Sequence, residues 1–151
     1  MHQKKIAIYG STGSIGKQTL EVISTHPELF TAEILTAFSN DALLIEQALQ
    51  FIPNIVVIGD ITKYANVKKA LEGKPIKVFA GEEALEQVAG MDCYDFMMAG
   101  IVGFAGLKPT LTAVRNGKTI GLANKETLVV AGDIFNCSHF ISIRFSKCIS
   151  A

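Results

Sequence analysis

The sequence is poor in cysteine, and the cysteines that it has are scattered. Cys93, Cys137 and Cys148 are odd in number and far apart along the chain. This pattern excludes a framework of disulfides and is typical of proteins from a reducing compartment. Cys137 and His139 lie close together, but a structural zinc site needs four ligands at a recognisable spacing, and no other ligand lies nearby. We therefore expect no structural zinc site.

The sequence also lacks long apolar runs and an excess of charge of either sign. Although 49% of its residues are hydrophobic, no uninterrupted apolar stretch approaches the ~20 residues that a membrane helix requires. Residues 1–5 lead directly into a short strand-like segment, without the apolar run of a secretory leader. The 14 acidic and 14 basic residues balance, so no overall field attracts nucleic acid or an anionic membrane. We predict a cytoplasmic protein that binds neither.

Apolar strand-like segments alternate with helix-like segments along most of the chain. Strands are expected at residues 5–9, 33–38, 55–59, 77–79, 95–99 and 119–123, and helices at 15–25, 41–51, 62–71, 82–89 and 107–116. This alternation predicts an α/β fold, a doubly wound and mostly parallel sheet with helices on both faces. A chain of 151 residues has room for one such domain. The apolar side chains expected to face the core from the first helix are Ile15, Leu20, Val22 and Ile23.

The most informative motif is a short apolar strand that runs into the turn Gly-Ser-Thr-Gly-Ser-Ile-Gly at residues 10–16 and opens a helix. Gly10 lets the chain reverse tightly, and Gly13 removes a side chain where a pyrophosphate would approach the backbone. Gly16 lets the new helix lie close to the sheet. Because free amides at a helix start attract an anion, this turn predicts nucleotide binding in a Rossmann-like domain.

The same turn also has a plainer interpretation. Its G-x-x-G-x-x-G spacing differs from the commonest dinucleotide-binding spacing, G-x-G-x-x-G, and a lone glycine triplet is weak evidence. In this alternative the turn only joins a strand to a helix, and the side chains that cap the helix amides are Ser11, Thr12 and Ser14.

The end of the second expected strand, Ala37-Phe38-Ser39-Asn40, bears on the choice of cofactor. NAD-dependent folds usually carry a carboxylate here that binds the ribose hydroxyls. The first acid is Asp41, so little would repel a 2′-phosphate, and Ser39 and Asn40 can donate hydrogen bonds to it. We therefore favour NADP, although no arginine or lysine is adjacent in the sequence. In the alternative, Asn40 and Asp41 form only a helix cap.

Two later segments also follow expected strands, at the edge where open parallel sheets bind ligands. Residues 99–107 are rich in small residues, which either admit a cofactor against the backbone or only allow flexibility and close packing. Asn124, Lys125 and Glu126 interrupt an apolar strand at its carboxyl end. They offer hydrogen bonds and a cation to a ligand, or they form a capped helix start.

Together, the turn at 10–16, the segment 99–111 and the segment 117–129 closely resemble the 1-deoxy-D-xylulose 5-phosphate reductoisomerase family. The three motifs occur in the family's order, and the resemblance runs from about Lys4 to Asp133. It implies an NADPH-binding domain at residues 1–134 of an enzyme of the non-mevalonate isoprenoid route. That enzyme converts 1-deoxy-D-xylulose 5-phosphate to 2-C-methyl-D-erythritol 4-phosphate by rearrangement and NADPH-dependent reduction, with magnesium or manganese holding the substrate oxygens.

The resemblance also assigns residues to the cofactor and the substrate. Lys125 would bind the substrate. The residues that would contact NADPH are Thr12, Gly13, Ser14, Ile15, Phe38, Ser39, Asn40, Asn124 and Glu126. Phe38 departs from the family, in which many members have a small residue at this position and often a basic one next to it.

The tail at residues 135–151 departs further. The family continues to an Asp-Ser-Glu-His motif that supplies metal ligands, and this motif is absent from the sequence. We therefore expect no catalytic or metal-binding residue in this chain, and most of the family dimer surface to be absent. We also expect no turnover by this polypeptide alone, because nothing would hold the metal that polarises the substrate. The abrupt change suggests a truncated or shifted reading frame. Two alternatives are a stand-alone dinucleotide-binding regulatory module and a fragment that associates through exposed apolar surface.

Overall fold

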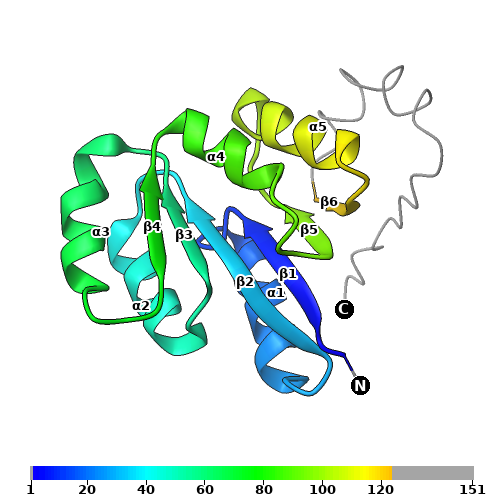
Figure 1. The fold of residues 1–151 in the computed structure, drawn as a ribbon, viewed down its shortest axis with the longest axis horizontal. Coiled ribbons are helices and arrows are strands. Elements are labelled where there is room, and N and C mark those ends of the chain that lie inside the picture. Colours follow the sequence, from blue (N-terminus) through cyan, green and yellow to red (C-terminus); the bar gives the residue numbers. More distant parts are fainter. Residues whose placement is uncertain (1, 124–151) are drawn as a thin grey trace.

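The computed structural model describes residues 2–123, which form one six-stranded sheet with helices on both faces (Figure 1). The sheet order is β4-β3-β2-β1-β5-β6, and every neighbouring pair is parallel. The strands are β1 (Lys4–Tyr9), β2 (Phe30–Ala37), β3 (Ile55–Ile58), β4 (Lys77–Ala80), β5 (Phe96–Ala99) and β6 (Thr119–Leu122). This arrangement confirms the predicted Rossmann-like α/β fold.

Helices connect the strands in the expected alternation. They are α1 (Ser14–Thr25), α2 (Asp41–Phe51), α3 (Tyr64–Ala70), α4 (Glu82–Ala89) and α5 (Leu107–Arg115), with short 3-10 turns η1 (Ile61–Lys63) and η2 (Phe104–Gly106). Across residues 2–123, no helix has the length and apolar character that a membrane crossing requires. The longest of these helices, α1, has 12 residues.

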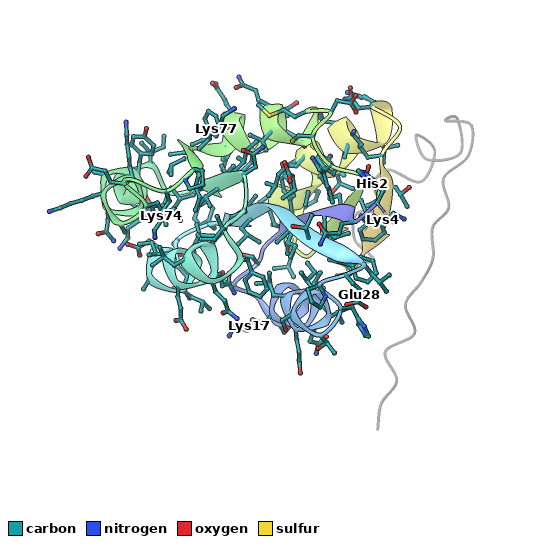
Figure 2. The ribbon with its side chains drawn as sticks, turned by 60° about the horizontal axis from the view of Figure 1, so that its bottom comes forward. His2, Lys4, Lys17, Glu28, Lys74 and Lys77 are labelled. Atoms are coloured by element: carbon teal, nitrogen blue, oxygen red, sulfur yellow. The ribbon has the colours of Figure 1, made fainter. Side chains whose placement is uncertain are left out.

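The helices divide between the two faces of the sheet, as Figure 2 shows from a turned view. On one face, β1 residues Ile6 and Ile8 share a core with Leu20 of α1 and with residues of α2 and α3. On the other face, Ala7 and Tyr9 pack with residues of α4 and α5. Successive side chains of a strand point to opposite faces, so a sheet covered on both sides needs apolar residues at nearly every position.

Several details differ from the expectations. β2 begins at Phe30, three residues before the expected start. The predicted third helix begins as η1 and becomes α3 only at Tyr64. Val22, expected in the core, is 50% exposed, whereas Leu20 and Ile23 are buried. Leu20 and Ile23 are three residues apart and lie on one face of α1, while Val22 points away from that face.

The strand order reverses at β1. Chain order runs outward from β1 through β2 and β3 to β4, and the chain then returns to place β5 on the other side of β1. In open parallel sheets, ligands bind in the crevice outside the carboxyl ends of the strands at such a switch point. The turn after β1 and the turn after β5 therefore border the candidate site.

Candidate functional site

The turn between β1 and α1 is held in place by β2. The Gly10 amide donates to Thr36 Oγ1 at 3.0 Å, and the Ser11 amide donates to the Thr36 carbonyl oxygen at 2.8 Å. Within the turn, the Gly13 amide donates to the Gly10 carbonyl at 3.2 Å. Thr36 is fully buried, so water does not compete for these bonds. The backbone of the turn is thus ordered by the protein itself.

The first and third glycines of the turn have the predicted geometric roles. Gly10 has a φ of +87°, which favours glycine, and its Cα faces the backbone of Gly100 at the end of β5. A Cβ added at Gly16 would lie 2.2 Å from the Gly10 carbonyl oxygen and 2.5 Å from Ser11 Cα. Only glycine lets α1 begin so close to the turn.

The amino end of α1 is open. Gly13 is its N-cap, with φ −78° and ψ 174°, and no side chain caps the helix. The expected capping of α1 by the side chains of Ser11, Thr12 and Ser14 is therefore wrong. Ser11 is instead buried, and its Oγ contacts no hydrogen-bond partner among the described residues. The first turn of α1 also carries no acidic residue. The first amides of a helix lack intrahelical partners and attract anions, so this end can bind one.

Space for a ligand exists beside this helix end. A Cβ added at Gly13 would have one close neighbour, the Gly10 carbonyl oxygen at 3.5 Å, which is an ordinary contact. Gly13 and Ser14 are exposed, and Thr12 and Ile15 are partly exposed. A pyrophosphate fits these features, because it requires uncovered backbone amides and an absence of negative side chains.

The segment after β2 lies next to the segment after β3. The Asp60 amide donates to the Phe38 carbonyl at 2.7 Å, and the Phe38 ring lies over Gly59, where a Cβ would be 2.6 Å from ring atom Cδ2. Phe38 is nevertheless 60% exposed, and Ser39 is exposed. Asn40 caps α2, since its Oδ1 accepts from the Leu43 amide at 3.2 Å. Asn40 therefore forms a helix cap, and its side-chain amide nitrogen keeps its capacity to donate a hydrogen bond.

Sequence reasoning missed a cation at this place. Lys63, from η1, lies with its Nζ 3.5 Å from Asp41 Oδ1, in the first turn of α2. Asn66 Nδ2 donates to the other oxygen of Asp41 at 2.6 Å, and this bond, followed by Lys63, lowers the pKa of that carboxyl below its ordinary value. No sequence signal pointed to Lys63, because the pairing depends on η1 folding back onto α2.

The segment after β5 borders the same edge. Gly103 has a φ of +74°, and the neighbouring Val102 and Phe104 are 79% and 78% exposed. The Gly100 amide donates to the Tyr9 carbonyl, which ties this segment to the end of β1. The two interpretations of these small residues, cofactor contact and close packing, both remain open.

The strand before the predicted polar triad ends beside the site. Leu122 of β6 pairs with Ala99 of β5, and the Ala123 amide donates to the Ala99 carbonyl at 3.2 Å. The predicted site residues that lie outside the described residues are Asn124, Lys125 and Glu126. The pair Cys137 and His139, which we do not expect to bind zinc, and the tail at 135–151 also lie outside them. Within the described part of the chain, no group of three or more His, Cys, Asp and Glu side chains could hold a metal ion.

Other buried or basic groups do not line this edge, although Tyr9 is the last residue of β1. Burial raises the pKa of the Tyr9 and Tyr94 hydroxyls, which donate to the carbonyls of Leu85 and Ala89, so both act as structural groups. Burial also raises the pKa of the Cys93 thiol, which disfavours the reactive thiolate. An open hollow between α3 and β4 is bordered by lysines that include Lys74 and Lys77, both labelled in Figure 2.

Comparisons with known proteins agree on one family. A family model described as 1-deoxy-D-xylulose 5-phosphate reductoisomerase matches residues 6–132. Over 134 residues, the chain is 52% identical to the 1-deoxy-D-xylulose 5-phosphate reductoisomerase of Phocaeicola vulgatus and 54% identical to that of Bacteroides fragilis. These matches cover 89% of this chain and 35% and 34% of the two relatives, so the chain spans about a third of their length.

Solved structures of the same kind are also similar. The 1-deoxy-D-xylulose 5-phosphate reductoisomerase of Zymomonas mobilis in complex with NADPH matches with a TM-score of 0.84 and 40% identity, over 89% of this chain and 35% of that one. A crystal structure of DOX-P reductoisomerase in complex with NADPH, fosmidomycin and magnesium matches with a TM-score of 0.83 and 38% identity, over 88% of this chain and 33% of that one.

Proposed function

The chain belongs to the 1-deoxy-D-xylulose 5-phosphate reductoisomerase family, and we propose that it supplies the NADPH-binding part of such an enzyme. One observation carries the proposal: the amino end of α1 is uncapped and free of acids, and it lies at the switch point of the sheet. An anionic pyrophosphate is the ligand that such a helix end favours. The proposed domain is residues 1–134.

The proposed cofactor contacts fall into two described groups. Thr12, Gly13, Ser14 and Ile15 would bind the pyrophosphate side, and Phe38, Ser39 and Asn40 the adenosine phosphate. The exposed Phe38 ring offers an apolar surface beside the α2 start. Asn124 and Glu126 belong to the proposal as further NADPH contacts, and Lys125 as a substrate contact.

The whole enzyme's chemistry is part of this proposal too. In the full-length enzyme it is the rearrangement of 1-deoxy-D-xylulose 5-phosphate and its NADPH-dependent reduction to 2-C-methyl-D-erythritol 4-phosphate, with magnesium or manganese as the metal. This polypeptide alone would have no turnover, and the surface of the family's homodimer would be largely absent from it. The cytoplasm is the proposed location, since three scattered cysteines are typical of a reducing compartment.

Titration of the 151-residue chain with NADPH and NADH, followed by nicotinamide fluorescence, tests the proposal. Gly13→Asp is the decisive variant. The backbone of Gly13 is extended, and aspartate is a favoured N-cap, so this variant should melt at or above the wild-type temperature. Its charge would lie against the pyrophosphate, so we expect NADPH affinity to fall by at least about tenfold.

Gly13→Ala is the matched control, because it adds the same Cβ without the charge. It should bind NADPH more tightly than Gly13→Asp does. Wild-type affinity in a folded Gly13→Asp protein would overturn the assignment of the turn. An absence of saturable binding by a folded wild-type chain would overturn the proposed function.

A further inference from the structure

The turn that would bind the pyrophosphate receives one more hydrogen bond, from α2. Gln47 Nε2 donates to the Ser11 carbonyl oxygen at 3.0 Å. Gln47 is only 6% exposed and lies between Leu44 and Ala48 on the buried face of α2, which is otherwise apolar. A polar side chain in such a place is costly unless it forms a hydrogen bond.

The bond also fixes which way the Gln47 amide points. Of the two ends of this amide, only the nitrogen can donate to a carbonyl oxygen. Gln47 Oε1 is buried without a hydrogen-bond partner among residues 2–123, and so is Ser11 Oγ at the same turn. Among the described residues, the bond to the Ser11 carbonyl is thus the one hydrogen bond that the Gln47 side chain forms.

Holding the Ser11 carbonyl orients the next amide. In a trans peptide the C=O and the following N–H point in opposite directions, and the described residues contain no cis peptide. With the Ser11 oxygen directed toward α2, the Thr12 N–H points to the opposite side. A flipped peptide would instead direct a partially negative oxygen to that side, which disfavours an anion.

We propose that Gln47 is a positioning residue for the phosphate-binding turn, because it holds the Ser11–Thr12 peptide in the orientation that presents the Thr12 N–H to the cofactor's pyrophosphate. The inference rests on the proposed function and adds a residue outside the glycine motif. Thr36 holds the preceding Gly10 and Ser11 amides, and Gln47 holds the carbonyl that follows. The pyrophosphate is common to NADPH and NADH, so Gln47 affects both cofactors by the same factor.

Two substitutions separate positioning from packing. Gln47→Glu keeps the shape of the side chain, but its ionised carboxylate accepts hydrogen bonds only and repels the Ser11 oxygen. When protonated, the introduced carboxyl can donate again, and burial raises the pKa at which this happens. Gln47→Met fills similar space and cannot donate at any pH. Gln50→Met is the control, since Gln50 is an exposed residue of the same helix.

Calorimetric titration with NADP⁺ and NAD⁺, the forms that withstand acid, gives the readout in the 151-residue chain. The affinity of each variant is divided by the wild-type affinity at the same pH, so that the titration of other groups in the protein and in the cofactor cancels. We expect Gln47→Glu to weaken both cofactors by about tenfold at high pH and to recover as the pH falls, whereas Gln47→Met stays weak throughout. Gln50→Met should match the wild type.

A melting curve for each variant shows that the measured protein is folded. Folded Gln47 variants that bind both cofactors with wild-type affinity would overturn the inference and leave the proposed function intact. A Gln47→Glu protein that stays as weak in acid as Gln47→Met would also overturn it, since the loss then comes from packing. Should Gln47→Glu fail to fold, Gln47→Met decides by its affinity alone. A wild-type chain that binds neither cofactor overturns the proposed function and the inference together.

Discussion

The turn after β1 and the paired segments after β2 and β3 lie along the same sheet edge, but they are built differently. The β1–α1 turn is held by buried, uncharged groups, Thr36 and Gln47. The second region, which we call the rim (residues 38–41 and 59–63), is mostly exposed. A backbone hydrogen bond from Asp60 to Phe38 joins its two segments, and the Lys63–Asp41 ion pair adds charged groups that the turn lacks.

This difference has a consequence for selectivity. Buried hydrogen bonds hold a backbone rigidly and are insensitive to salt. A backbone held in this way suits the binding of the pyrophosphate, which all dinucleotides share. Exposed ion pairs contribute little to stability, but they set the local charge where a 2′-phosphate would lie. Changes in the turn should therefore affect fold and both cofactors, whereas changes in the rim should affect the choice between cofactors.

The largest effect should come from Gly16→Ala. The added Cβ would lie 2.2 Å from the Gly10 carbonyl oxygen, so α1 or the turn must shift. We expect a loss of about 3 kcal/mol of folding stability, seen as a fall of several degrees in the melting temperature. Gly90→Ala is the control, because its Cβ has only ordinary contacts, the nearest at 3.4 Å. Equal melting temperatures for the two variants would contradict the close approach.

Thr36→Val should have the next largest effect. It keeps the shape of the buried side chain but leaves the Gly10 amide without its 3.0 Å acceptor. The expected cost is about 1 kcal/mol in thermal or urea unfolding, with equal weakening of NADPH and NADH. Thr31→Val is the control, since Thr31 is a partly exposed residue of the same strand. It should alter neither the stability nor the affinity for the two cofactors. If only NADPH bound more weakly, Thr36 would act on the recognition of the 2′-phosphate and not on the turn that both cofactors share.

Lys63→Met should change cofactor choice with little effect on the fold. It removes the cation beside Asp41, which then repels a 2′-phosphate near Asn40. We expect NADPH affinity to fall by about threefold at low salt, by less at high salt, and NADH affinity to stay unchanged. Lys69→Met, an exposed change on α3, is the control. An equal loss of NADH affinity would contradict the expectation that Lys63 affects the choice between the two cofactors.

The smallest effect should be the pH dependence contributed by Asp41. Its pKa is lowered from the ordinary 3.8, first by the Asn66 hydrogen bond and then by Lys63. A lowered folded-state pKa means that Asp41 contributes stability above pH 3.8, and that this contribution disappears as the pH falls through the folded value. The melting temperatures of wild type and Asp41→Asn should therefore differ most at neutral pH and converge in acid. A difference that does not change with pH would contradict the lowered pKa of Asp41.

The sequence predicted the elements of this fold well, because each depends on local periodicity. All six strands appear near their expected positions, and α2 and α4 have the expected bounds. The strands are apolar runs because both sheet faces are covered. Val22 was misplaced, since a hydrophobic residue in a helix does not reveal which face meets the sheet.

The candidate site was predictable only where its residues are consecutive. The glycine motif located the turn, and the resemblance to the family led to the proposed cofactor, because these signals lie within a few neighbouring positions. Gln47 and Lys63 carry no such signal. The sequence also gave no indication that Ser11 would be buried instead of capping α1.

What the residues specify locally is thus the alternation of strands and helices, the turn after β1 and the family. The folded chain adds the partners of that turn, 26 residues away at Thr36 and 36 residues away at Gln47. It also pairs Lys63, which follows β3, with Asp41, which follows β2. Parallel strands bring their carboxyl ends to one edge, so side chains distant in sequence meet there, and no local pattern records which of them will touch.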